Sequence, residues 1–152
     1  MRHKKFEGFI NEGIVKKQTL DKSRAEFLIK ESENAYDLLL IKIEKLGVSN
    51  NTANDIIKSC YDILMELIRA KMLLDGYNAS GIGAHEAEIA YLEILNYEER
   101  DIRFLDQLRY FRNGMLYYGT ILDAGYAEKV IDFTKRNYKK LIKEIKLVKK
   151  SN

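Results

Sequence analysis

The chain of 152 residues contains no proline at all. Proline interrupts helices because it lacks a backbone N–H group and clashes with the preceding turn, so its absence permits long helices anywhere in the sequence. Long runs of Leu, Ile, Lys, Glu and Ala are typical of helices as well. This length suffices for one domain with a hydrophobic core and no disulfide or metal. The sequence therefore predicts an all-α protein in which residues 1–152 form a single helical domain.

Glycines and Asn/Asp clusters divide the chain into segments whose apolar residues recur with a 3.6-residue period. Thr52 with Asp55, and Asn96 with Glu99, resemble the caps at which two of these helices begin. We predict an antiparallel up-and-down bundle of about five to six helices. The first is short and peripheral, within residues 1–18. The predicted helices cover residues 4–17, 21–46, 52–75, 85–95 and 96–119, and the chain from residue 124 onward.

The composition indicates a soluble, cytoplasmic protein that does not enter a membrane. The longest purely aliphatic run, residues 38–41, is far shorter than the roughly 20 residues of a membrane-spanning helix. The basic start "MRHKKFEGFI" has no uninterrupted apolar stretch of the kind that signal peptides contain. The single cysteine, Cys60, cannot form an internal disulfide, which fits a reducing compartment.

Charge is unevenly distributed although the net charge is only +3. From Lys135 to Lys150 the sequence has eight basic residues and one acid, whereas seven acids and two arginines lie between Glu86 and Asp106. This asymmetry has two interpretations. It could steer an anion such as RNA toward one end of the molecule, or the last helix could simply expose a solvated lysine-rich face.

Arg112 interrupts the apolar stripe of the fifth predicted helix, in the stretch "RYFRNGMLYYG". At 100° per residue it falls near the centre of a face formed by apolar residues. Burying an unpaired guanidinium costs several kcal/mol. Three interpretations follow: Arg112 pairs with Asp62 or Glu66 on another helix, it lines a cleft for an anionic ligand, or it borders a groove shared by two subunits. The residues that form this face are Ile102, Leu105, Leu108, Phe111, Met115 and Leu116.

The sequence lacks the residues that phosphate-binding loops and metal sites require. The loop at Gly81 and Gly83 has neither a preceding strand nor the Lys-Ser/Thr pair of a phosphate-binding loop. His85 is not followed by a second histidine at zinc-binding spacing, because Ile89 occupies that position. One cysteine cannot supply a thiolate cluster. We therefore predict no metal and no cofactor.

The stretch "FRNGMLYYG" resembles the signature of HEPN domains, which are small helical bundles. Their hallmark is an arginine, usually followed by a polar residue, and then a histidine after a short spacer. Arg112 and Asn113 match the start, and Tyr117 stands where the histidine belongs. The order and lengths of the predicted helices also match from about residue 21 onward.

The resemblance implies a groove at the two-fold interface of a homodimer, where arginine and histidine cleave RNA without a metal. Many such proteins are toxins or defence effectors, often paired with a nucleotidyltransferase that modifies a tyrosine near the motif. By this resemblance, Arg112, Asn113 and Tyr117 are the candidate catalytic residues. The candidate substrate-binding residues are Arg109, Tyr118 and His85.

Tyrosine in place of histidine favours loss of catalysis. At pH 7 only about one in a thousand tyrosines of ordinary pKa is ionised, so Tyr117 would be a poor general base. Arg112 and Tyr117 also lie about 140° apart around a regular helix. Our leading hypothesis is a catalytically degenerate HEPN-like domain that binds RNA, a nucleotide or a partner nucleotidyltransferase. The alternatives are an active RNase that uses Tyr117 or Tyr118, and an interaction bundle without a ligand site.

Overall fold

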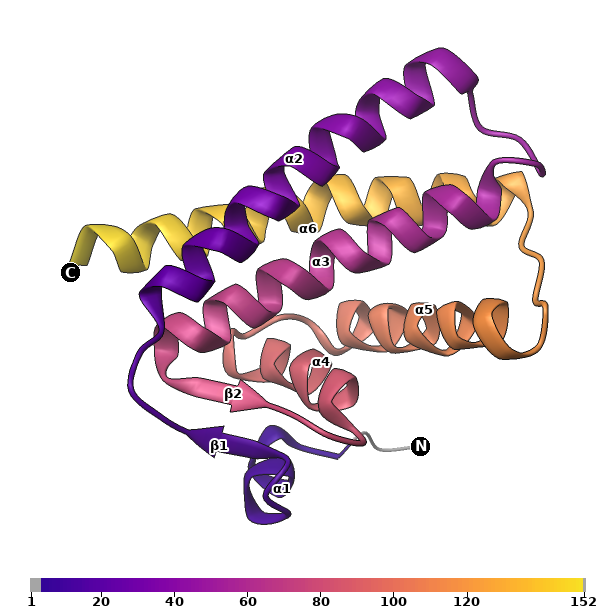
Figure 1. Cartoon of the computed structure of the whole chain (residues 1–152). Coiled ribbons are helices and arrows are strands. Elements are labelled where there is room, and N and C mark those ends of the chain that lie inside the picture. The colour runs from indigo at the N-terminus through magenta and orange to yellow at the C-terminus, as the bar shows by residue number, and fades with distance from the viewer. Residues whose placement is uncertain (1–3, 152) are drawn as a thin grey trace.

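The computed structural model describes the backbone of residues 4–151 and the side chains of residues 4–147. Within this part of the chain the protein folds into six helices and one pair of short strands, which confirms the predicted all-α class (Figure 1). The longer helices α2, α3, α5 and α6 alternate in direction, as in an up-and-down bundle. The elements are α1 (Phe6–Asn11), β1 (Val15–Lys17), α2 (Lys22–Leu46), α3 (Ala53–Asp75), β2 (Tyr77–Ala79), α4 (Ala84–Ile94), α5 (Glu99–Tyr117) and α6 (Ala124–Ser151).

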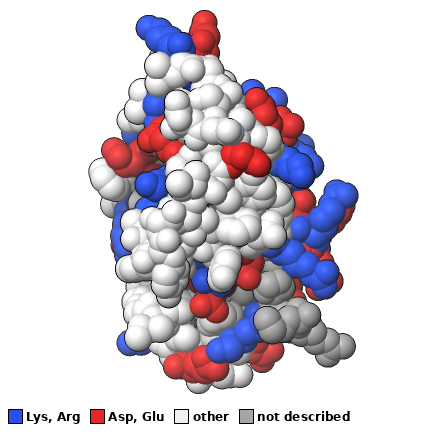
Figure 2. Space-filling view, turned by 90° about the vertical axis from the view of Figure 1, so that its right-hand side faces the viewer, with Lys and Arg blue, Asp and Glu red and all other residues white. Residues whose placement is uncertain are grey.

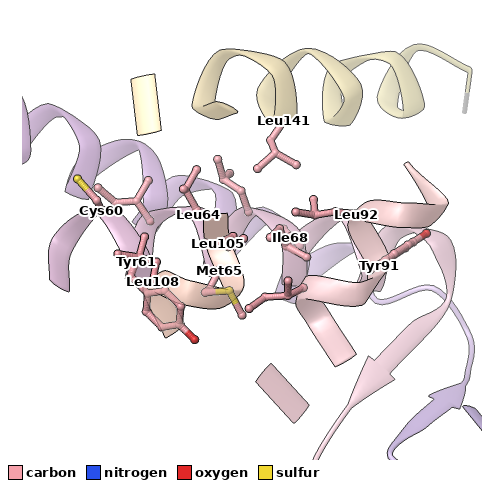
Figure 3. Packing of buried hydrophobic residues seen from close by; sticks show 14 of the residues in the cluster. Cys60, Tyr61, Leu64, Met65, Ile68, Tyr91, Leu92, Leu105, Leu108 and Leu141 are labelled. Atoms are coloured by element: carbon pink, nitrogen blue, oxygen red, sulfur yellow. The ribbon is translucent and has the colours of Figure 1, made fainter. Parts of the chain in front are cut away.

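Helix α3 is the centre of the bundle and contacts α2, α4, α5 and α6. Its sequence is apolar on nearly all sides, which is the pattern of a helix surrounded by other elements. Figure 3 shows Leu64 and Ile68 of α3 gathered with Leu92 from α4, Leu105 from α5 and Leu141 from α6. All five side chains are almost fully buried. The core therefore fixes how α4 and α5 lie against α3.

The N-terminal segment differs from the single helix predicted over residues 4–17. Gly13 adopts a left-handed backbone conformation (φ 78°), which ends the helical stretch after α1. Strand β1 then pairs antiparallel with β2, with Val15 opposite Ala79. The ring of Phe6 stacks on Tyr91 of α4 at a centroid distance of 4.9 Å. The glycine-containing loop after α3 thus supplies a strand partner.

Two predicted helix caps work differently in the structure. Asn96 has a positive φ of 63° and follows the end of α4, so it does not cap α5, whose N-cap residue is Glu98. Thr52 does occupy the N-cap position of α3. Its hydroxyl, however, donates to the carbonyl of Gly47 and accepts from the N–H of Ser49, so it caps no N–H group of α3. Side-chain hydrogen bonds within the α2–α3 connection replace the predicted capping box.

Candidate functional site

Arg112 lies in the C-terminal half of α5 and faces α3. Leu105 and Leu108 on the same helix are buried against α3, and Arg112 follows Leu108 by one helical turn. The helical repeat therefore places the guanidinium at the same packing interface. Its nearest acid is Asp62 of α3, whose Oδ1 lies 4.0 Å from Nε of Arg112.

The guanidinium of Arg112 has no acceptor within the described part of the chain. Its Nε and Nη1 atoms are shielded from solvent and form no hydrogen bond with any described residue. The contact with Asp62 is at the outer limit of an ion pair, and 55% of the Asp62 side chain is exposed. Covered N–H donors without acceptors are destabilising, so this arginine is poorly explained by packing alone.

The neighbouring candidate residues, in contrast, are held by partners. Arg109 donates from Nε to Asp106 at 2.9 Å. Nδ1 of His85 lies 3.2 Å from Glu88, and the same carboxylate accepts two hydrogen bonds from Arg69, at 2.6 and 3.1 Å. Glu88 is almost fully buried at its pair with Arg69.

The surroundings of Arg112 contain more acids than bases. Burial raises the pKa of Asp62, although the nearby charge of Arg112 acts in the opposite direction. Burial and the neighbouring carboxylate of Asp62 both raise the pKa of Glu66, one turn further along α3. Oε2 of Glu66 is covered and accepts no hydrogen bond from any described residue. This side of the molecule is therefore not a basic RNA groove within one chain.

Tyr117 and Tyr118 point away from this cluster. Their exposed fractions are 75% and 86%, and neither hydroxyl has a hydrogen-bond partner within the described part of the chain. Asn113 is exposed too. The structure thus brings Arg112, Arg109 and His85 to one side of α3, whereas the two exposed tyrosines lie outside this cluster. The spacing in the sequence had already indicated this separation.

Gly114 explains how the chain turns after α5. A side chain at this position would place Cβ only 2.5 Å from Oγ1 of Thr120, so the glycine lets the α5–α6 connection fold back against the helix. Asn54 of α3 then holds this connection: it donates to the carbonyl of Thr120 and accepts from the N–H of Leu122, both at 2.9 Å. Neither contact was predictable from the sequence, because Asn54 lies more than 60 residues away from its partners.

The fold leaves a mostly uncharged surface at the end of α5. We call the exposed residues Tyr110, Leu116, Tyr117, Tyr118 and Ile121 the α5 end surface; each is more than half exposed. Figure 2 looks onto the end of the molecule that carries the α2–α3 and α5–α6 connections and shows a broad uncharged area with charged groups mainly around it. Apolar surface of this kind often marks an interaction site. A groove of about 430 Å³ lies beside it, lined by Asn50, Gln107, Phe111, Ile121, Leu122, Asp123 and Tyr126.

The described residues show neither a metal-binding cluster nor a membrane-spanning helix. No group of three or more His, Cys, Asp or Glu side chains there is arranged to hold a metal ion. No helix in the same residues combines the length and the apolar character that crossing a membrane requires. Comparison with known proteins found no matching family model, no matching curated protein and no matching solved structure.

Proposed function

We propose that this chain is a catalytically degenerate HEPN-like domain that binds a phosphate-bearing ligand through Arg112. In this proposal the motif helix α5 also mediates a homodimer, and the second copy docks on the α5 end surface. The ligand is a nucleotide or a short RNA segment. The family assignment depends on the motif at Arg112 and Asn113 and on the order of the helices.

The unsatisfied guanidinium of Arg112 carries the proposal. Arginine presents its N–H groups in a fork that fits phosphate oxygens, and here two of these nitrogens are positioned without an acceptor among the described residues. Arg69 and Arg109 on the same side already donate to carboxylates. Arg112 is therefore the arginine of this cluster best prepared to accept an anionic ligand.

The arrangement supports binding over cleavage. A general base must lie within hydrogen-bonding reach of the proton that it removes. Tyr117 is exposed on a surface other than the one that Arg112 faces, and His85 contacts Glu88. The active RNase that uses Tyr117 or Tyr118 therefore becomes the second hypothesis. The acids around Arg112 also favour a ligand of nucleotide size, because they repel a long phosphate backbone.

Binding of nucleotides and of a short RNA, measured by calorimetry in EDTA, tests this function. Arg112→Ala should weaken binding at least about tenfold, the loss expected for one charged hydrogen-bonding partner. Arg103→Ala is the matched control, since Arg103 lies on the same helix but pairs with Glu99 at the surface. Equal affinity in the wild type and the Arg112 variant would refute the proposed site. RNA cleavage by the wild type that is lost in Arg112→Ala would establish the RNase instead.

A partner nucleotidyltransferase is an alternative occupant of the α5 end surface. The exposed hydroxyls of Tyr117 and Tyr118 are accessible to such an enzyme. Either hydroxyl could attack the α-phosphate of a nucleoside triphosphate, forming a phosphodiester and releasing pyrophosphate and a proton. Intact-mass measurement after co-expression with a candidate transferase would detect the adduct, and Tyr117→Phe and Tyr118→Phe would locate it. An unchanged mass would remove this alternative.

A further inference from the structure

A second surface, unrelated to Arg112, lies where α2 and α6 meet. The rings of Tyr36 on α2 and Tyr138 on α6 stack at a centroid distance of 3.8 Å and are almost parallel. Beside Tyr138, a shallow groove of about 420 Å³ runs along α6, and Ile142 and Leu147 are its apolar lining residues. Three of the residues that line this groove are lysines: Lys139, Lys143 and Lys146.

Together with Lys135, these lysines form what we call the basic ridge of α6. The four positions fall within an arc of about 80° and extend over about 16 Å of helix. No ion pair or hydrogen bond joins any of the four to a described residue. Other basic residues of α6 do have partners: Arg136 donates to Asp101, and Lys140 lies over the ring of Tyr97. Lys149 and Lys150, which continue the basic sequence, lie outside the described side chains.

Helix α2 carries a matching acidic ridge. Glu26, Glu33, Asp37 and Glu44 fall within an arc of about 40° of the helix that contains no basic residue, and Lys30 lies about 20° outside it. None of the four acids forms an ion pair or hydrogen bond with a described residue. Burial and, after it, the negative charges of Glu33 and Asp37 raise the pKa of Tyr138, so these two acids lie close to the ring that borders the groove. Ile41, next to the acidic ridge on α2, is about half exposed.

Two ridges of opposite charge thus lie on one face of the molecule without neutralising each other. A two-fold axis between them would place the acidic ridge of each protomer against the basic ridge of the other. Such a self-complementary patch is what a symmetric dimer interface requires. We propose that the α2–α6 face binds a second copy of this chain, with α2 of each protomer packed along α6 of the other.

The exposed apolar residues of this face support a protein partner over a nucleic acid. Ile41 and Leu147 would be covered in such a contact, with the charged ridges at its rim. A phosphate backbone would leave these apolar residues exposed. It would also be repelled by Glu33 and Asp37 next to the lysines.

This contact is independent of the proposed function, because it uses residues of α2 and α6, and the α5 end surface uses none of them. If both interfaces form and their two-fold axes intersect at right angles, the assembly closes with four copies. If only the α2–α6 face associates, the assembly is a dimer.

Charge reversal of one ridge at a time provides the test, with the mass of the assembly measured by sedimentation and native mass spectrometry at micromolar concentration. The double variant Lys139→Glu with Lys143→Glu makes the middle of the basic ridge acidic. Glu33→Lys with Asp37→Lys makes the middle of the acidic ridge basic. Each double variant alone should associate at least about tenfold more weakly than the wild type, because like charges then face each other. Mixing the two should restore association as a mixed assembly.

The control Lys16→Glu with Lys17→Glu introduces the same change in net charge at exposed positions of β1. It should leave the mass of the assembly unchanged. In the wild type, raising the salt concentration should weaken the association, which tests the same contact without any substitution. Circular dichroism of each variant checks that the bundle is folded.

The inference is overturned if both double variants keep the wild-type mass, or if the mixture fails to associate. It is also overturned if the lysine variant loses RNA retention while the mass stays the same, since α6 would then be a nucleic-acid surface. Leu116→Glu separates this inference from the proposed function. Loss of association in Leu116→Glu but not in the ridge variants would support the α5 end surface and refute the α2–α6 contact.

Discussion

Replacing Arg112 by leucine should make the protein more stable while abolishing its ligand binding. The side chain of Arg112 is 21% exposed and two of its guanidinium nitrogens are covered without an acceptor in the described residues. Leucine retains the apolar part of the side chain that packs between α5 and α3. It removes the charge and the unsatisfied donors.

The expected magnitude follows from two opposing contributions. Covered donors without acceptors cost about 1–3 kcal/mol. The pair with Asp62 offsets little of this, because an ion pair with a partner 55% exposed contributes at most about 1 kcal/mol. The free energy of unfolding of Arg112→Leu should therefore increase by roughly 1–2 kcal/mol. For a chain of this size that increase corresponds to a rise in Tm of about 2–8 °C.

Urea denaturation followed by circular dichroism measures this change. Arg103→Leu is the control: Arg103 pairs at the surface with Glu99, so its replacement should change stability by less than about 0.5 kcal/mol. A loss of more than about 1 kcal/mol in Arg112→Leu would show that Arg112 is a structural ion-pair residue. In that case the reasoning behind the proposed ligand site would be wrong.

Three other substitutions or reactions test the surrounding structure. Gly114→Ala should destabilise the protein by about 1–2 kcal/mol, because the new methyl group clashes with Thr120 and the cost of this overpacking exceeds the gain in helix propensity. In a double-mutant cycle, adding Thr120→Gly should recover part of the lost stability, and strictly additive effects would refute the clash. Glu66→Gln should stabilise the protein at pH 7 by about 1 kcal/mol. Burial raises the folded-state pKa of Glu66, so the contribution of Glu66 to stability is most favourable at low pH and is lost as the pH rises through the raised pKa. The stability advantage of Glu66→Gln should therefore vanish below the ordinary pKa of about 4.5. A stability difference that does not depend on pH would contradict this cause. Cys60 is buried and burial raises its pKa to about 11. Iodoacetamide at pH 8 should therefore leave Cys60 unmodified in the native protein and alkylate it after unfolding. Rapid alkylation of the native protein would show that the core around α3 opens readily.

The helices of this protein were predictable because their signals are local. Gly47 and Gly76 end α2 and α3 as the sequence indicated, and the apolar period identified each of the long helices. The β1–β2 pair was missed, because Val15 finds its partner strand more than 60 residues later in the chain. A short strand stabilised by such a distant partner has no periodic signal of its own.

The candidate site was predictable only in part for a similar reason. An arginine within an apolar stripe was visible in the sequence, and so was Asp62 as its possible partner. Whether the guanidinium is satisfied depends on distances between α3 and α5, and these follow from the packing of Leu105 and Leu108. The fold-back of the α5–α6 connection over Gly114 likewise depends on Asn54, which no pattern near the motif reveals.

Arg112 and the two charged ridges share one physical property that connects the proposals. Folding brings these charged groups to defined positions but leaves Nε and Nη1 of Arg112 without hydrogen-bond acceptors, and the ridge residues without ion pairs, among the described residues. An unneutralised charge at a packed or half-buried position adds nothing to the stability of the isolated chain, and a partner that supplies the missing charge gains affinity from it. The two cases differ in what completes them. A planar fork with covered donors requires oxygen acceptors that reach into the α3–α5 interface. Neighbouring ridges of opposite sign require a surface with the same pattern in reverse, which a second copy of this chain provides.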